Sequence, residues 1–202
     1  MVALYPLLAL RLLAAAQPAA PPAAPPDSAT RAVRYDVTVA APVAEVWRAL
    51  STADGLRSFF APAAEIELRA FGKFSIQFDP STPGSSAEDN VVLAVEPERM
   101  LSTTWNAPPA YPQVRAQRTL LQFRLAPEGP ACTRVTIVQS GFGTGPEWDA
   151  TYEYFRGAWT WVAASLQHRF EHGPIDWRAP PDLLPRMRAI GGDAAVAWAR
   201  RT

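Results

Sequence analysis

The two histidines of the chain, His168 and His172, have the types and the spacing that could do chemistry most directly. With Glu171 they spell H-x-x-E-H, in which two imidazoles four residues apart share one helix face, as a zinc pair requires. A third ligand would be expected downstream, but no glutamate follows Glu171. The motif also runs up to Gly173, and a histidine in the last turn of a helix can simply pair with the final carbonyls. We therefore expect no metal and no cofactor.

Other catalytic arrangements lack the residues they need. Because both histidines lie in one motif, a Ser-His-Asp or Cys-His site elsewhere in the chain is excluded. Cys132 lies at the start of an alternating segment, so a structural cysteine is the simpler interpretation. The glycine-rich segment 141–145 lacks the Gly-Lys-Ser/Thr of a phosphate loop, and a turn into a helix explains it. A carboxylate at a strand end, such as Glu65 or Glu96, could act as an acid or base in an apolar pocket. No pattern selects one, so we name no catalytic residue.

The overall composition argues against functions that depend on charge. The 202 residues include 19 Lys and Arg and 19 Asp and Glu, so the formal net charge is zero. Nucleic-acid binding through aromatic side chains needs a basic groove around them, and the sequence contains no such cluster. The length supports one ordinary domain with appendages. We expect no nucleic-acid partner.

The N-terminus has the pattern of a targeting segment. Residues 1–16 are apolar apart from Arg11 and end in three alanines, which is a small-residue cleavage site. This run is too short for a transmembrane helix, which needs about 20 residues. Residues 17–30 are rich in Pro and Ala, as expected of a linker. We expect a signal peptide at 1–16, a linker at 17–30, no membrane span, and a periplasmic or secreted protein, with a cytoplasmic location as the alternative.

A long helix near the C-terminus is the element that would position an apolar site. Its large apolar residues recur at steps of three and four, and Gly145-Pro146 and Gly173-Pro174 mark its ends. Burying each large side chain is worth roughly 1.5–3 kcal/mol, so another element must cover this apolar stripe. The stripe consists of Trp148, Tyr152, Phe155, Trp159, Val162, Ala163, Leu166 and Phe170.

The segments before this helix alternate in the manner of β-strands. A run of strands separated by Pro and Gly is typical of an antiparallel meander that would cover the helix. Two short helices, beginning at Pro42 and Asp54, follow the first strand. Residues 175–202 are punctuated by proline, and we expect a tail that packs loosely or extends, in which 192–201 could form a short helix. The expected strands are 34–40, 66–68, 74–78, 91–95, 101–105, 115–125 and 133–139.

This order of elements, with five segments, resembles the SRPBCC (START-like, Bet v 1-like) superfamily. Within it, the sequence is most similar to the activator of Hsp90 ATPase homologue 1-like domain family. The chain departs from the family at Phe71, where a second Gly is frequent, and at Gln139, where His is frequent. The resemblance implies an α+β helix-grip domain over 31–174, in which a curved antiparallel sheet of about seven strands wraps around the long helix. The segments are VAAPVAEVWRALSTADGLRSFFAP (39–62), FGKFSIQFDP (71–80), PERMLSTTW (97–105), TRVTIVQSGF (133–142) and WDATYEYFRGAWTWVAASLQHRFEHG (148–173).

The resemblance also implies a largely apolar cavity between the sheet and the long helix. Members of the superfamily bind lipids, hormones or polyketides, some are cyclases, and some regulate a chaperone; the fold alone does not decide between these. We expect non-catalytic binding of a small hydrophobic, lipid- or polyketide-like ligand. The alternatives are a polyketide cyclase- or hydrolase-like enzyme that uses the same cavity, and a protein-interaction module of the Hsp90-activator kind.

Nine aromatic or aliphatic residues are candidates to line that cavity, although each could instead be an ordinary core residue. Trp105 and Trp159 are the strongest of them, because a helix midpoint that faces a mid-sheet aromatic residue lies where the grip is deepest. The candidates are Phe60, Phe74, Phe78, Trp105, Phe123, Tyr152, Phe155, Trp159 and Leu166.

We expect the mature protein from its native host to begin near Gln17, because the three preceding alanines match a signal-peptide cleavage site. N-terminal sequencing of the purified protein checks this. Recovery of Met1 or Val2 from the soluble intracellular fraction would contradict export and would favour the alternative of a chaperone partner.

Overall fold

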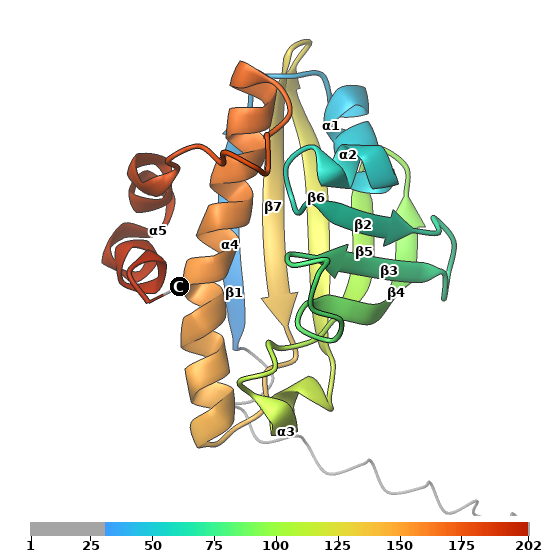
Figure 1. Cartoon of the computed structure of the whole chain (residues 1–202). Coiled ribbons are helices and arrows are strands. Elements are labelled where there is room, and N and C mark those ends of the chain that lie inside the picture. Colours follow the sequence, from blue (N-terminus) through green and yellow to red (C-terminus); the bar gives the residue numbers. More distant parts are fainter. Residues whose placement is uncertain (1–30, 202) are drawn as a thin grey trace, which may run out of the picture.

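A computed structural model describes residues 31–201 (Figure 1). The expected signal peptide at 1–16 and linker at 17–30 lie outside the described residues. Within the described range, no helix is long and apolar enough to cross a bilayer. The elements are β1 (Ala32–Val39), α1 (Val43–Ser51), α2 (Ala53–Arg57), β2 (Ala63–Ile66), β3 (Lys73–Gln77), β4 (Ala87–Glu96), β5 (Met100–Trp105), α3 (Pro112–Arg115), β6 (Thr119–Gly129), β7 (Cys132–Ser140), α4 (Pro146–His172) and α5 (Leu184–Ala199).

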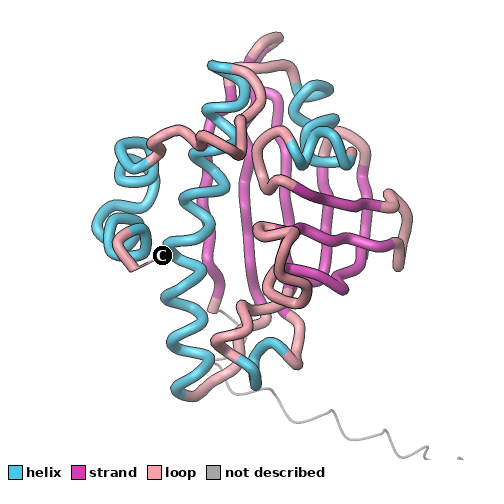
Figure 2. The backbone as a smooth tube through the Cα atoms, in the orientation of Figure 1, coloured by secondary structure: helices cyan, strands magenta, loops and turns pink. Residues whose placement is uncertain are grey.

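The strands form one seven-stranded antiparallel sheet with the order β1-β7-β6-β5-β4-β3-β2. The register shifts within the β3–β4 pair and again within the β4–β5 pair, and such irregularities bend and twist a sheet. As a result, β2 and β3 run across the direction of β1, β6 and β7 (Figure 2). The sheet curves towards α4, so the predicted helix-grip fold, with its two short helices after the first strand, is confirmed.

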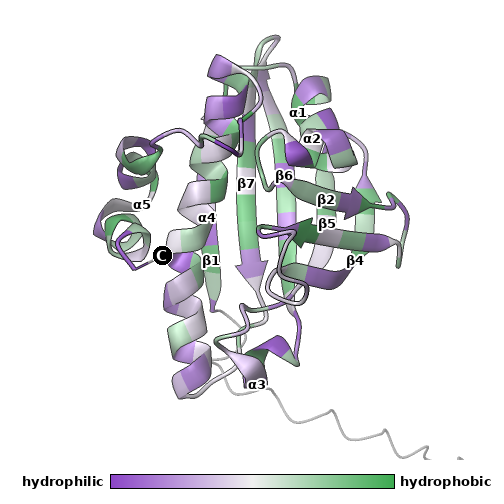
Figure 3. Ribbon diagram, viewed as in Figure 1, coloured by the Kyte–Doolittle hydropathy of each residue, from purple (hydrophilic) through white to green (hydrophobic). Residues whose placement is uncertain are grey.

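The long helix α4 has the ends that its two Gly-Pro pairs predict. Pro146 lies in the first turn with Glu147 and Asp149, which favour the positive end of the helix dipole, and Gly173 follows the last residue. In Figure 3 α4 is mostly pale, with purple at its two ends, whereas much of β7 is green. Tryptophan and tyrosine have intermediate hydropathy, so the colouring does not reveal how deeply α4 is buried. The buried part of its apolar stripe is Phe155, Trp159, Val162, Ala163 and Leu166.

Helices α1 and α2 close one end of the sheet and bring an aromatic pair into the core. Thr52 caps α2, because its hydroxyl oxygen accepts a hydrogen bond from the Gly55 amide at 3.0 Å. A Cβ at Gly55 would lie 2.6 Å from the Cα of Ala49, so the two helices can meet only with a glycine there. Phe59 and Phe60 follow α2 and are fully buried.

Two segments differ from the sequence-based expectation. The strand expected at 115–125 starts only at Thr119, because Pro112 begins a helical turn, α3, that ends at Arg115. The strand expected to reach Leu68 ends at Ile66, and the Leu68 side chain is exposed.

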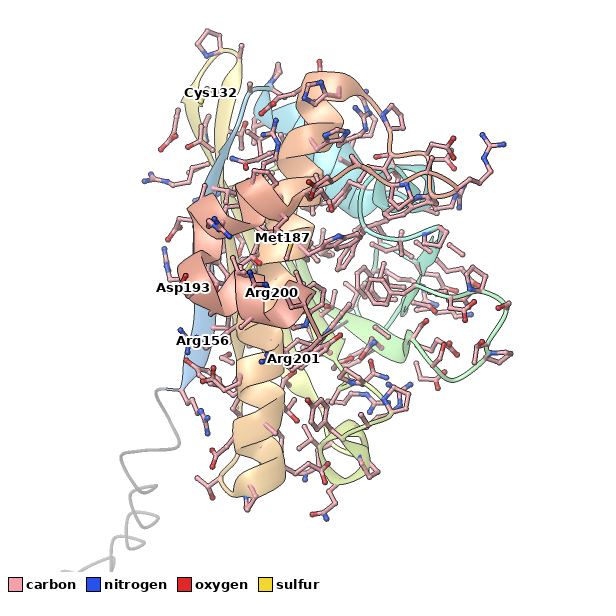
Figure 4. All side chains as sticks on the ribbon, turned by 60° about the vertical axis from the view of Figure 1, so that its left-hand side comes forward. Cys132, Arg156, Met187, Asp193, Arg200 and Arg201 are labelled. Atoms are coloured by element: carbon pink, nitrogen blue, oxygen red, sulfur yellow. The ribbon has the colours of Figure 1, made fainter. Side chains whose placement is uncertain are left out.

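The C-terminal tail also differs, because it forms a helix that packs on α4 instead of extending. Helix α5 lies on the side of α4 away from β2–β5 (Figures 1 and 4). Met187, labelled in Figure 4, is buried in a small second core with Ala164, Leu183 and Ala195. Gly192 has a φ of 58°, and this kink divides α5 into two parts that both contact α4. The consecutive glycines at 191–192 look like a helix break in the sequence, which is why the first part was missed.

One close approach fixes α5 against α4. A Cβ built on Gly157 of α4 would lie 2.0 Å from the Cβ of Trp198 and 2.2 Å from its Cγ. These are not the far atoms of a flexible side chain, so the indole could not avoid a larger residue by a simple rotation. Gly157 is therefore the residue that admits Trp198 to the surface of α4.

We expect Gly157→Ala to destabilise the protein by about 1–3 kcal/mol, the usual cost of overpacking. In a Trp198→Gly background, which removes the Cβ of residue 198 together with the ring, the same substitution should cost nothing, or stabilise by up to about 1 kcal/mol, because alanine is the better helix former. Urea unfolding of the four proteins of this double-mutant cycle measures both values. An equal cost in the two backgrounds would show that α5 does not depend on this contact.

Candidate ligand-binding cavity

A cavity of about 560 Å³ lies between the curved sheet, α4 and the C-terminal tail. Ligand pockets in proteins have volumes of about 300–1,000 Å³ and are lined mainly by apolar and aromatic groups. Five of the seven tryptophans of the chain line this one cavity. They come from β5, from α4 and from the tail: Trp105, Trp159, Trp161, Trp177 and Trp198.

The aromatic floor of the cavity consists of Phe60, Trp105, Phe155 and Trp159. The ring centres of Trp105 and Trp159 are 5.2 Å apart, which joins the middle of the sheet to the middle of α4. Phe60 stacks on Trp105 with centres 5.7 Å apart, and Phe155 stacks on Trp159 at 6.1 Å. Each ring is at most 4 % exposed. The floor is thus a continuous aromatic layer that belongs to the core as well as to the cavity.

A buried series of hydrogen bonds holds this aromatic floor in place. The Trp159 indole N–H donates to Gln139 Oε1 at 2.6 Å, and Gln139 Nε2 donates to Thr119 Oγ1 at 2.8 Å. The Thr119 hydroxyl donates in turn to the Trp105 carbonyl oxygen at 2.9 Å. Gln139 has no exposed surface. This series of hydrogen bonds therefore links β7, β6, β5 and α4, and it fixes the orientation of the Trp159 ring.

The tail wall of the cavity consists of Trp177, Pro180, Pro181 and Trp198. Trp177 lies 5.9 Å from Trp161 between ring centres, and its indole N–H donates to the Arg57 carbonyl oxygen at 2.7 Å. Trp198 lies 5.9 Å from Tyr154, which also lines the cavity. The segment after α4 and the end of α5 are therefore part of the site and not an appendage to it.

Apart from the Tyr154 hydroxyl and the tryptophan N–H groups, the polar side chains of the cavity wall gather in one place, the polar end, formed by Ser85, Ser86, Asn106 and Arg115. The Ser86 hydroxyl oxygen accepts a hydrogen bond from the Phe78 amide at 2.9 Å, which ties the β3–β4 loop to the cavity. Asn106 Nδ2 donates to the Glu88 carbonyl oxygen at 3.0 Å.

Arg115 holds the loops of the polar end together. Its Nη2 donates to the carbonyl oxygens of Gly84 at 2.9 Å and Ser86 at 2.8 Å, and its Nη1 donates to that of Ala107. Burial, followed by the positive charge of Arg118, lowers the pKa of the Arg115 guanidinium.

Five of the nine candidate residues from the sequence line the cavity: Phe60, Phe78, Trp105, Phe155 and Trp159. The other four lie elsewhere in the fold. Phe74 packs behind Trp105, with ring centres 6.3 Å apart, and Phe123 packs behind Trp159 at 6.3 Å. Tyr152 packs on Phe142 at 5.2 Å, and Leu166 is fully buried further along α4. Contact of the five with a ligand stays a prediction.

Sequence reasoning missed the tail wall, the polar end and Trp161. Trp161 comes two residues after Trp159, which is off the stripe of steps of three and four, so a helical pattern places it on a different face. The signal that could have found these residues is the concentration of tryptophan in the last part of the chain. Three tryptophans, at 161, 177 and 198, follow Trp159.

The H-x-x-E-H motif is used to attach α5. Glu171 forms a bidentate ion pair with Arg186, in which Arg186 Nη1 lies 2.9 Å from Glu171 Oε1. The hydrogen bonds of this pair lower the pKa of Glu171. The rings of His168 and His172 lie 4.6 Å apart, and burial lowers the pKa of His168. Among residues 31–201, no group of three or more His, Cys, Asp or Glu side chains is placed to hold a metal ion.

The chemistry that the cavity wall offers is limited. Within the described part of the chain, its lining includes no carboxylate, imidazole or thiol. Glu65, a candidate acid in the sequence, pairs with Lys73 at 2.7 Å, and both side chains are largely exposed. Tyr154 is the phenol on the wall, and burial raises its pKa.

Solved structures share the fold of this chain. Protein MLL2253 from Mesorhizobium loti is 24 % identical, with a TM-score of 0.58 over 72 % of this chain and 100 % of that one. CalU16 from Micromonospora echinospora is 21 % identical, with a TM-score of 0.57 over 84 % and 86 %. The Aha1 dimer from Colwellia psychrerythraea is 16 % identical, with a TM-score of 0.56 over 71 % and 98 %.

Comparison with curated proteins yields no match. A family model described as "Activator of Hsp90 ATPase homolog 1-like protein" matches residues 40–171, from the end of β1 to the last turn of α4. That range is more than half of the chain and contains the sheet from β2 to β7, the two short helices and nearly all of the long helix. The chain therefore belongs to the family of Activator of Hsp90 ATPase homolog 1-like proteins.

Proposed function

We propose that this protein binds a small, largely apolar molecule in the cavity between the sheet, α4 and the C-terminal tail. The observation that carries the proposal is a cavity of about 560 Å³ with five tryptophans in its wall. Large rigid aromatic rings supply much contact area and lose little conformational entropy when they bind. A soluble domain that gathers most of its tryptophans around one space has a surface well suited to an apolar guest.

The architecture supports a preformed site. Gln139 orients Trp159, and the Trp105–Trp159 contact keeps sheet and helix at a fixed separation. A site that is already ordered loses less free energy on binding than one that must first close. On this basis the cavity holds its shape without a ligand.

The lining supports binding without catalysis over the enzymatic alternative. An acid–base catalyst works best when its pKa is near the working pH. Of the titratable side chains on the wall, Arg115 stays protonated at neutral pH, and burial moves the pKa of Tyr154 further above it. A cyclase or hydrolase that works by acid–base catalysis would need a group whose pKa lies near neutral pH.

The test uses N-phenyl-1-naphthylamine, a neutral fluorescent probe of apolar sites, with Trp161→Ala and Trp47→Ala as matched variants. Trp161 is on the cavity wall, whereas Trp47 is a partly buried residue of α1 that does not line it. We expect saturable binding to the wild type, a loss of affinity of about five- to tenfold in Trp161→Ala, equivalent to roughly 1–1.4 kcal/mol, and no change in Trp47→Ala. Fluorescence titration measures all three affinities.

Unfolding curves of the three proteins provide the control, since both variants must be folded at the titration temperature. Absence of saturable binding to the folded wild type would overturn the proposal. Equal losses in the two variants would place the probe outside the cavity and would overturn it as well.

A further inference from the structure

Arg115 is the one charged side chain on the wall of the cavity within the described part of the chain. The remaining polar residues of the polar end, Ser85, Ser86 and Asn106, are neutral. Every other part of the wall is aromatic, aliphatic or proline. An apolar molecule that filled the cavity would therefore meet a positive charge at one position only.

The hydrogen bonds of Arg115 fix its position but do not neutralise it. All three acceptors are backbone carbonyls, those of Gly84, Ser86 and Ala107. Over residues 31–201, Arg115 forms no ion pair. The nearby Glu88 carboxylate accepts instead from the Gly84 amide, at 3.1 and 3.2 Å. A guanidinium has five N–H groups, so three bonds to carbonyls leave donors for a further acceptor.

A positive charge in this position favours an anionic partner. The guanidinium is only partly exposed; burial and Arg118 disfavour its charge, and Glu88 and Asp89 favour it less strongly. An anion beside it would form a charge-assisted hydrogen bond, which is roughly twice as strong as a neutral one. Because the cavity wall offers one cation, it matches a single negative charge better than a phosphate monoester, which carries about −1.5 to −2 at neutral pH.

We infer that the ligand is a flat aromatic carboxylate, with its ring system between the tryptophans and its carboxylate on Arg115. This inference rests on the proposed function and adds the class of ligand and the residue that binds its carboxylate. Planarity follows from the wall, because indole and phenyl rings make their best contacts with flat rings in offset or edge-to-face arrangements.

The test compares 2-naphthoate with 2-naphthamide, which has the same ring system and a neutral end, by isothermal titration calorimetry. The wild type should bind the carboxylate about tenfold more tightly than the amide. In Arg115→Gln this ratio should fall to about two or less, and any loosening of the loops that Arg115 holds should weaken the binding of both probes alike. In Arg118→Gln, which removes the same charge three residues away at an exposed position outside the cavity wall, the ratio should stay near ten.

The ratio within each variant separates recognition from general loosening, because a loosened cavity would lose affinity for both probes. Should Arg115→Gln fail to fold, the wild type decides alone: its preference for the carboxylate must be present and must shrink as the salt concentration rises. A wild-type ratio near one, with N-phenyl-1-naphthylamine still bound, would overturn this inference and leave the proposed function intact. Tighter binding of 2-naphthyl phosphate than of 2-naphthoate would overturn the assignment of a monoanion. Failure of all the probes to bind would overturn both proposals.

Discussion

The hydrogen bond from the Trp159 indole to Gln139 is the interaction on which the arrangement of the cavity depends. Trp159 is 2 % exposed, so an unpaired indole N–H there would cost about 1–3 kcal/mol. Gln139 satisfies it and is itself satisfied by Thr119. With the ring direction fixed, one part of Trp159 packs on Phe155 and Trp105 while another borders the cavity. A ring free to turn could fill the space that now remains open.

The C-terminal tail adds a wall to this concave surface. Trp177 and Trp198 lie beyond residues 40–171, the range that matches the family model, yet both line the cavity. Two contacts hold the tail on α4: Gly157 leaves room for Trp198, and Glu171 forms an ion pair with Arg186 of α5. Strands β2–β7 and nearly all of α4 thus lie in the region that matches the family, whereas part of the cavity wall in this chain comes from outside that region.

Periodicity in the sequence predicted the sheet, the short helices and α4, because each buries one face at a regular spacing. It could not predict which apolar residues border the cavity. Phe123 and Trp159 are both buried and pack on each other, but only Trp159 lines the cavity, and a periodic pattern does not distinguish the two. The tail differs from the expectation for another reason: the helix breaks at Gly192, as the paired glycines indicate, but the residues before this break are also helical and pack on α4.

The distribution of polar groups also decides how such a site can be selective. The hydrogen-bonding groups of Gln139 and Thr119 are directed to one another and to Trp159 and Trp105, so the aromatic floor contributes contact area more than direction. Apolar contacts alone discriminate weakly, because one methylene group is worth only about 1–3 kcal/mol. Orientation must then come from the polar end, where Arg115 is held by three backbone carbonyls and keeps its charge. Under the proposed function, the apolar wall accepts many ring systems, and the charge of Arg115 at its edge determines which way round each one binds.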